Sequence, residues 1–168
     1  MENQITIREA ITENDLTRPA SADEGPISVK ILDDPNDRQI LDLENGFKKE
    51  IGEEPLSEEK QKRLRQAIRD GRITFFAAMC GCRAVGMCSV AKYYSTFDCS
   101  DVGVYEDFYI EPAFRGRGIA RELAEAAQAW CKDSGILSLT VCCAPCDEQM
   151  YHALGFDVGL GTTFAHME

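Results

Sequence analysis

The stretch EDFYIEPAFRGRGIARELAEAAQAW, residues 106–130, contains the end of a strand and the start of a helix. The strand is expected over residues 102–110 and stops before Pro112, which has no backbone N–H for a sheet. From residue 119 to residue 132 apolar side chains recur at helical spacing. The segment therefore predicts a glycine-rich turn, RGRGIA (residues 115–120), that leads from a strand into a helix.

The RGRGIA turn has the properties of an anion site suited to a diphosphate. Its glycines let the backbone approach a ligand, and the N–H groups at a helix start carry partial positive charge. Arg115 and Arg117 add two full charges. The usual phosphate motifs GxxxxGK[ST] and GxGxxG are absent from this turn, and no repeating βαβ pattern surrounds it. An ordinary glycine-rich turn with solvated arginines is the alternative interpretation.

The segments around this turn predict the order strand, two helices, three strands, helix, strand, helix, strand. The apolar run over residues 136–144 is typical of a central strand. The expected strands cover residues 27–32, 73–80, 85–94, 102–110, 136–144 and 156–165, and the expected helices cover residues 37–49, 57–70, 119–132 and 147–154.

Residues 27–168 are expected to form one domain, and residues 1–26 an N-terminal extension with a linker. Residues 5–10 alternate like a short strand, and residues 17–26 are a polar stretch with proline and glycine. The extension could be an extra edge strand, a domain-swapped arm or a disordered tail.

Composition narrows the function classes. A chain of 168 residues suits one domain with a real core. The net charge of −11 and the lack of a visible basic patch argue against a nucleic-acid partner. No apolar run reaches the length of a membrane span, and the N-terminus does not read as a signal peptide. A cytoplasmic protein without a membrane partner is therefore expected.

Eight cysteines raise the question of a metal site. Cys143 and Cys146 form a CxxC pair interrupted by Pro145, whereas Cys80 and Cys82 belong to a hairpin turn that is expected to be distant. A tetrahedral zinc site needs four ligands, so no metal is expected. Most of the cysteines are interpreted as apolar core residues, with Cys146 as an incidental reactive thiol near the active centre.

Three motifs together resemble the GNAT N-acetyltransferases over roughly residues 27–156. They are the R-x-x-G-x-A pattern of the turn, the strand before it, and YHALGF (residues 151–156). The resemblance implies an α+β fold, namely one GNAT-type acyl-CoA N-acyltransferase domain with a mixed, mostly antiparallel sheet and helices on both faces. It also implies acetyl-CoA as the acetyl donor and a homodimer. Residues 93–120 are similar to the spermidine/spermine (diamine) subgroup, which points to a small cationic amine.

The resemblance also implies roles for individual residues. Glu106 would take a proton from the amine through water, and Asp107 would attract the cationic substrate. Neighbouring strand residues face opposite sides, so only one of these two should point at the reacting centre. Tyr151 would give a proton to the leaving CoA thiolate. The implied contacts to acetyl-CoA come from Phe108, Tyr109 and Ile110 along the pantetheine arm and from Arg115, Gly116, Arg117, Gly118, Ile119, Ala120 and Arg121 around the diphosphate.

The sequence departs from the family pattern at three positions. Ala144 stands where the family often has an asparagine that contacts the cofactor, and Asp147 stands where a small apolar residue is usual. Leu139 replaces a glutamate of the strand before the last helix. This last departure leaves Glu106 as the better candidate for the base.

The sequence therefore predicts acetyl transfer from acetyl-CoA to a primary amine by direct attack in a ternary complex. The expected acceptor is a polyamine, a diamine or a lysine-like molecule. The alternatives are an acetyltransferase for an aminoglycoside, an amino acid or a protein N-terminus, and a non-catalytic acyl-CoA-binding module. A thiol or metal sensor is a further alternative.

Overall fold

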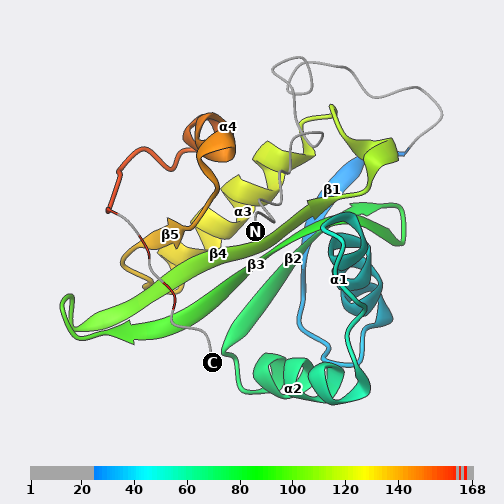
Figure 1. Cartoon of the computed structure of the whole chain (residues 1–168), viewed down its shortest axis with the longest axis horizontal. Coiled ribbons are helices and arrows are strands. Elements are labelled where there is room, and N and C mark those ends of the chain that lie inside the picture. Colours follow the sequence, from blue (N-terminus) through cyan, green and yellow to red (C-terminus); the bar gives the residue numbers. More distant parts are fainter. Residues whose placement is uncertain (1–24, 162, 164, 166–168) are drawn as a thin grey trace.

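A single sheet with helices on both faces makes up the part of the chain that the structure, a computed structural model, describes: residues 25–161, 163 and 165 (Figure 1). The prediction for residues 1–26 falls almost entirely outside these residues. In chain order the elements are β1 Ile27–Leu32, α1 Arg38–Glu50, α2 Glu58–Arg69, β2 Ile73–Cys80, β3 Arg83–Ser95, β4 Ser100–Ile110, the 3₁₀ helix η2 Pro112–Phe114, α3 Ile119–Asp133, β5 Leu139–Val141, the 3₁₀ helix η3 Pro145–Asp147 and α4 Glu148–Ala153.

The strands lie in the order β1-β2-β3-β4-β5. Neighbours from β1 to β4 pair antiparallel, whereas β4 and β5 pair parallel. The mixed, mostly antiparallel sheet and the α+β class are therefore confirmed. Local signals set the helix starts: the Asp37 side chain accepts a hydrogen bond from the Gln39 N–H (2.9 Å), and Ser57 accepts one from the Lys60 N–H (3.3 Å).

The prediction of a long central strand over residues 136–144 is wrong. Strand β5 has three residues and lies at the edge of the sheet. Pairing stops at Val141, and the chain then turns away into η3, which begins at Pro145. Proline cannot donate to a ladder, and an apolar run alone does not distinguish a strand from the partly buried segment seen here.

The strand expected over residues 156–165 is also absent from the described part of that range. Phe156 packs against the core, but the chain that follows it is irregular. Val158 and Leu160 are both exposed. Their alternation is the pattern of a half-buried strand, yet no sheet edge pairs with the described residues here.

The short β5 leaves one edge of β4 uncovered. β5 pairs with β4 only from Gly103 to Tyr105, although β4 continues to Ile110. On its other side β4 pairs with β3 along its length, apart from one irregularity. Residues 106–110 of β4 therefore present backbone groups on the side where β4 and β5 diverge.

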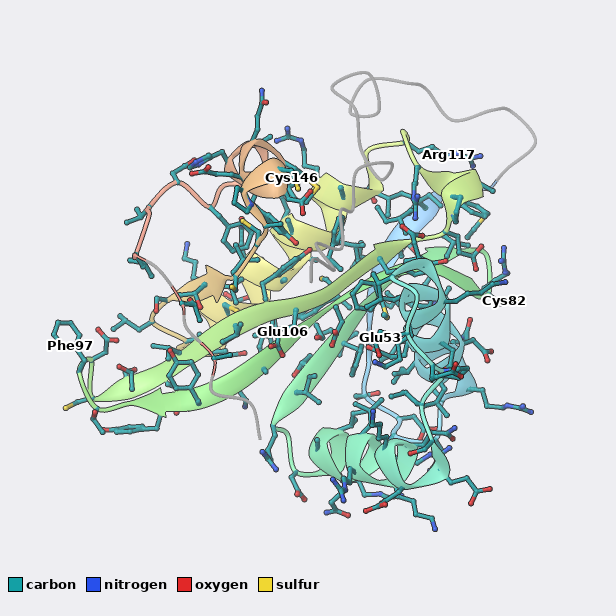
Figure 2. The ribbon with its side chains drawn as sticks, in the orientation of Figure 1. Glu53, Cys82, Phe97, Glu106, Arg117 and Cys146 are labelled. Atoms are coloured by element: carbon teal, nitrogen blue, oxygen red, sulfur yellow. The ribbon has the colours of Figure 1, made fainter. Side chains whose placement is uncertain are left out.

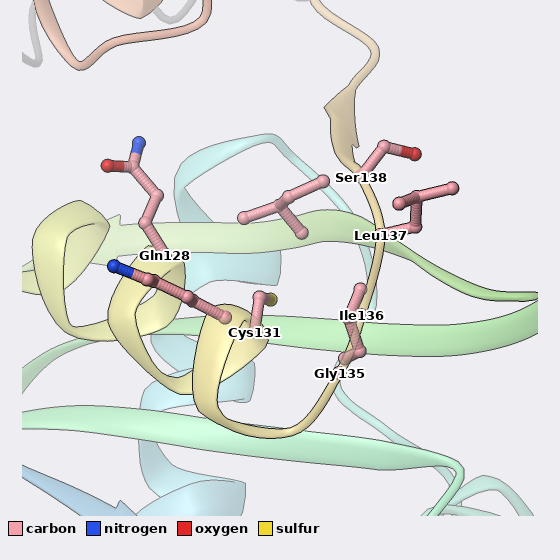
Figure 3. Close-up of a pocket in the computed structure, with 8 residues that line it drawn as sticks. Gln128, Cys131, Gly135, Ile136, Leu137 and Ser138 are labelled. Atoms are coloured by element: carbon pink, nitrogen blue, oxygen red, sulfur yellow. The ribbon is translucent and has the colours of Figure 1, made fainter.

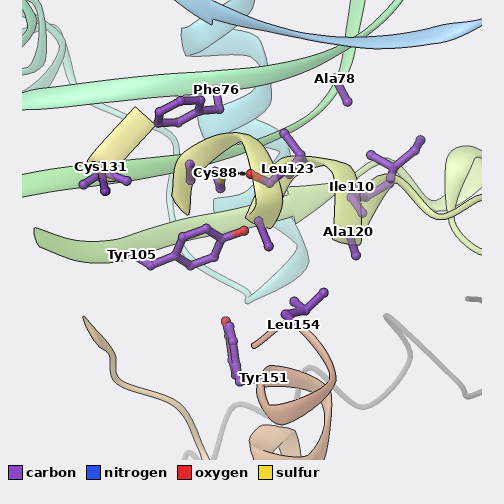
Figure 4. Packing of buried hydrophobic residues seen from close by; sticks show 14 of the residues in the cluster. Phe76, Ala78, Cys88, Tyr105, Ile110, Ala120, Leu123, Cys131, Tyr151 and Leu154 are labelled. Carbon is purple, nitrogen blue, oxygen red and sulfur yellow. Dashed lines mark hydrogen bonds between the residues drawn. The ribbon is translucent and has the colours of Figure 1, made fainter. Parts of the chain in front are cut away.

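Two apolar clusters, one on each face of the sheet, form the core. Helices α1 and α2 cover one face, with Ile40, Phe75 and Met87 buried between them and the strands. On the other face α3 and α4 pack on the sheet through Leu123 and Tyr151 (Figure 4). The candidate site lies at β4, the strand that borders both apolar clusters.

The interpretation of most cysteines as core residues is wrong. Cys88 and Cys131 are buried, and Cys80 is half-buried. The remaining five are exposed: Cys82, Cys99, Cys142, Cys143 and Cys146. All of the exposed ones lie in turns or in irregular and 3₁₀ segments, where the chain has no face turned to the core.

We expect Leu123→Ala to lower the free energy of unfolding by about 2–5 kcal/mol, because this side chain is wholly buried in α3 and its loss leaves a cavity. Urea denaturation monitored by circular dichroism measures the change. Leu137→Ala is the matched control, since Leu137 is 63% exposed and its truncation should change stability by less than about 0.5 kcal/mol. Equal effects of the two substitutions would contradict this description of the core.

Candidate active site at the bulge of β4

A β-bulge in β4 shapes the centre of the site. Met87 of β3 pairs with Tyr109, but Ser89 pairs with Glu106, so Asp107 and Phe108 together oppose Cys88. Asp107 adopts a left-handed conformation with φ of +52°, which is uncommon for a residue other than glycine. Such local strain is often found at functional sites.

The bulge breaks the alternation of side chains that the sequence predicts. The Ser89 hydroxyl donates to the Asp107 carboxylate at 3.3 Å, on the face of the sheet covered by α1. Asp107 and Glu106 both act electrostatically on Glu44 of α1. The extra residue resets the alternation at these two acids, and that only one of them points at the reacting centre stays a prediction.

Glu44 is a site residue that the sequence interpretation missed. It is 6% exposed, and its Oε1 atom has no hydrogen-bond partner within the described chain. Burial above all, together with the charges of Asp107 and Glu106 and against the charge of Lys48, raises the pKa of Glu44 to about 8. A signal was available: Glu44 lies on the apolar stripe of α1 between Ile40 and Phe47, where a carboxyl group is unexpected.

We expect the stability of the protein to fall as the pH rises from about 5 to about 8. A carboxyl group whose folded pKa is raised binds a proton more tightly in the folded chain than in the unfolded one, so its favourable contribution is present at low pH and is lost as the pH passes through the folded pKa. Glu44→Gln should flatten this dependence and be most stabilising, relative to the wild type, near pH 8. Urea denaturation at several pH values measures the effect.

Asp42→Asn is the control for this prediction, because Asp42 is an exposed acid on the same helix. It should leave the pH dependence unchanged. A Glu44→Gln variant with the pH dependence of the wild type would show that Glu44 titrates normally in the folded protein.

The other two acids have raised pKa values as well. Burial, followed by the charge of Asp107, raises the pKa of Glu106. Burial also raises the pKa of Asp107, although the Ser89 hydrogen bond and the charge of Lys48 act in the opposite direction. A base whose pKa lies closer to neutrality takes up a proton more readily, so both carboxylates suit proton transfer from an amine.

The glycine-rich turn follows directly after β4 and η2. Gly116 and Gly118 have φ of +74° and +80°, and Gly118 is the N-cap of α3. No side chain caps this helix start, so its first backbone N–H groups are not covered by a capping group. The glycine turn and the uncapped helix start are therefore present after β4, and the diphosphate site there stays a prediction.

The two arginines of the turn contact the protein itself. Arg115 donates from Nε to the Ile110 carbonyl at 2.9 Å and forms an ion pair with Glu50 at the end of α1. Arg117 donates to the Ala113 carbonyl at 2.7 Å, and its guanidinium lies 4.8 Å from the centre of the Phe114 ring. Arg115 thus ties the turn to both β4 and α1, which holds the turn in place.

We expect Gly118→Ala to weaken acetyl-CoA binding by about tenfold. A Cβ at this left-handed position costs about 1–2 kcal/mol of strain, and relief of the strain moves the N–H groups that would face the diphosphate. Isothermal titration calorimetry measures the affinity. Gly135→Ala is the matched control, since Gly135 has a φ of +70° at the far end of α3 and an equally open surrounding.

Both substitutions should lower stability to a similar extent, but only Gly118→Ala should lower affinity. Equal acetyl-CoA affinities in the two variants would place the cofactor elsewhere.

Tyr151 packs against β4 on the face of the sheet that α3 and α4 cover. Its ring makes edge contacts with Tyr105, at 6.4 Å between centroids, and with Phe156, at 5.9 Å. Tyr105 is the residue immediately before Glu106. Burial raises the pKa of Tyr151 well above its ordinary value, with Cys143 and Asp147 acting in the same direction, so the hydroxyl stays protonated near neutral pH. Tyr151 thus contacts the residue that precedes Glu106 in β4, and its role as the acid stays a prediction.

Figure 2 shows how these features are distributed. Glu106 lies midway along β4, Arg117 lies beyond the end of the strand near the start of α3, and Cys146 lies beside α4. Cys82, on the turn between β2 and β3, lies well away from Cys146. Among the described residues no group of three or more histidine, cysteine or acidic side chains is arranged to hold a metal ion.

A surface hollow lies away from these residues. An open hollow of about 410 Å³ lies between the C-terminal part of α3 and the segment that leads into β5 (Figure 3). Gln128, Cys131 and Ile136 contribute to its lining, and none of the lining residues belongs to the predicted site. The bulge, the uncovered edge of β4 and the turn therefore define the candidate site. No helix of the described chain is both long and apolar enough to cross a membrane.

Comparison with known families agrees with this geometry. The model of the Acetyltransferase (GNAT) family matches residues 38–156. The chain therefore belongs to the GNAT acetyltransferase family.

Among curated proteins, the chain is similar to aminoglycoside N(6')-acetyltransferase type 1 of Stenotrophomonas maltophilia, with 30% identity over 93 residues. The match covers 53% of this chain and 61% of that protein, which is less than two thirds of its length. The enzyme of the same name from Salmonella typhimurium strain LT2 is 26% identical over 98 residues, or 55% of this chain and 68% of that protein. These relatives do not support a particular closeness to the spermidine/spermine subgroup.

Solved structures share the fold. An aminoglycoside acetyltransferase from an uncultured soil metagenomic sample, in complex with sisomicin, superposes with a TM-score of 0.74 at 13% identity, covering 84% of this chain and 95% of that one. A predicted acetyltransferase of Clostridium acetobutylicum with acetyl-CoA gives a TM-score of 0.70 at 14% identity, covering 84% of this chain and 96% of that one. At these identities the likeness shows the fold alone.

Proposed function

We propose that the protein is an N-acetyltransferase that moves an acetyl group from acetyl-CoA to a primary amine of a small cationic acceptor. The observation that carries this proposal is the position of the bulge. The bulge sets Asp107 against Ser89 on the face covered by α1, where Asp107 and Glu106 act electrostatically on the buried Glu44, and the same strand leads into the glycine-rich turn.

The same elements suit acetyl-CoA. The diphosphate would bind the N–H groups of residues 116–121, at the uncapped start of α3. The pantetheine arm would lie along the main chain of residues 108–110, where β5 no longer covers β4, like a partial added strand. The thioester would then lie near Glu106 and Tyr151 at the divergence of β4 and β5.

The chemistry follows from these placements. The acceptor arrives as an ammonium ion and loses a proton through water to Glu106, because only the neutral amine can attack. Its nitrogen forms a bond to the thioester carbonyl carbon, and the carbon–sulfur bond then breaks. Tyr151 gives its proton to the departing CoA thiolate and regains one as the new amide nitrogen loses its second proton. The sum is an amide, free CoA and one released proton.

We infer the class of the acceptor amine from the negative charge of the candidate site and of the whole chain. The cluster of carboxyl groups and the net charge of −11 both favour a cation. A polyamine, a diamine or a lysine-like molecule fits this chemistry. An aminoglycoside, which is also polycationic, is the second candidate acceptor. Both curated relatives described above are named as aminoglycoside acetyltransferases.

Mass spectrometry of the products tests the proposal. The protein is incubated with acetyl-CoA and a mixed pool of polyamines, lysine analogues, aminoglycosides and short peptides. We expect an acetylated product from a polycationic member of the pool. A product from the peptides alone would contradict the acceptor class, and no product while acetyl-CoA is bound would favour a non-catalytic binding module. A thiol colour assay is unsuitable because five cysteines are exposed.

The homodimer and the cytoplasmic location stay predictions. Sedimentation of the purified protein tests the dimer.

A further inference from the structure

One carboxyl oxygen of Glu44, Oε1, has no hydrogen-bond partner among the described residues. The Glu44 side chain is buried between α1 and the sheet. A buried polar atom without a hydrogen bond lowers stability by about 1–3 kcal/mol. Such atoms therefore usually bind a ligand or a water molecule. A carboxylate forms its strongest hydrogen bonds with a positively charged N–H donor.

The charges around Glu44 are unbalanced. Lys48 lies one turn further along α1, and Asp107 and Glu106 reach the same region from β4. The charge of one lysine thus acts against three carboxyl groups. The Asp107 carboxylate accepts a hydrogen bond from the Ser89 hydroxyl and forms no ion pair with a described residue. Burying several negative charges together is costly, and burial with the neighbouring acids therefore raises the pKa of Glu44.

We propose that Glu44 and Asp107 form a subsite that binds a second ammonium group of the acceptor. The neighbouring Glu106 takes the proton from the ammonium group that is acetylated. This inference rests on the proposed function and deepens it: the substrate must carry at least two amino groups. The unpartnered Glu44 oxygen supplies the acceptor for the second ammonium, and the bulge turns Asp107 toward the same place.

Two consequences distinguish this subsite from a merely structural acid. A diamine should be a better substrate than a monoamine of the same length, because only the diamine reaches Glu44. Binding of the second ammonium should also drive a proton off the carboxyl pair, since the ligand supplies the positive charge that the ionised form lacks.

The experiment compares a linear alkane diamine with the alkyl monoamine of the same chain length. For the wild type we expect kcat/KM to be at least about tenfold higher for the diamine, chiefly through KM. Glu44→Gln should bring the ratio near one, because KM for the diamine should rise toward that for the monoamine. Asp42→Asn, an exposed acid on the same helix, should keep the wild-type ratio. An unchanged ratio in Glu44→Gln would overturn the proposal.

A binding measurement covers the case in which a variant fails to fold or the amines are not acetylated. Calorimetry of the diamine with the wild-type protein, in two buffers of different ionisation enthalpy, should show proton release near pH 7.5 that the monoamine does not produce. Equal proton release for both amines would reject the subsite. Loss of all acetylation with proton release intact would instead reject the proposed reaction, so the two failures are distinguishable.

Discussion

Replacing Glu106 by glutamine is expected to lower kcat for amine acetylation by about 10²–10⁴-fold, while the protein stays folded and binds acetyl-CoA with unchanged affinity. A positioned general base contributes about this much to a proton-transfer step, and glutamine keeps the size of the side chain without its ability to accept a proton. Steady-state kinetics with the best acceptor of the pool gives kcat, and calorimetry gives the cofactor affinity.

The pH dependence sharpens this prediction. Glu106 must be ionised to act, and its pKa is raised, so the wild-type rate should rise with pH through that raised value. In Glu106→Gln this rise of the rate with pH, the acidic limb of the pH–rate profile, should disappear. Asp101→Asn, at an exposed position near the other end of the same strand, should keep both the rate and the limb. A Glu106→Gln variant with wild-type kcat would remove Glu106 from the mechanism.

Replacing Tyr151 by phenylalanine should lower kcat by about 10²-fold with little change in KM or stability. The ring contacts with Tyr105 and Phe156 are kept by phenylalanine, and only the proton donor is lost. The raised pKa of Tyr151 keeps this donor protonated when the thiolate leaves. The size of the effect depends on how far departure of the thiolate limits the rate.

Tyr94→Phe is the matched control. It also removes a tyrosine hydroxyl group, but from an exposed side chain on β3. It should behave as the wild type. If Tyr151→Phe also behaves as the wild type with a range of acceptors, then the thiolate takes its proton from elsewhere and the family role assigned to Tyr151 is wrong.

Much of this architecture was predictable because its signals are local. The helical spacing after residue 118 gives α3 almost to the residue, and the caps at Asp37 and Ser57 give the starts of α1 and α2. The glycine turn was predictable for the same reason, since left-handed residues at a helix start select for glycine.

The features that the sequence did not predict depend on contacts between distant segments. The bulge arises from a change of register between β3 and β4, and no local pattern marks Asp107 as the extra residue. The short edge strand β5 depends on where the parallel pairing to β4 ends. The apolar stripe of α1 marks Glu44 as unusual, but its link to Asp107 and Glu106, more than 60 residues away in the chain, has no local signal.

The most direct test of the account is a crystal structure of the protein with CoA and a diamine. We expect the diphosphate on the N–H groups of residues 116–121 and the pantetheine arm along residues 108–110. The thiol should lie near Tyr151, and one amino group should face Glu106. A complex with the diphosphate away from the start of α3, or with the thiol out of reach of the bulge, would contradict the proposed site.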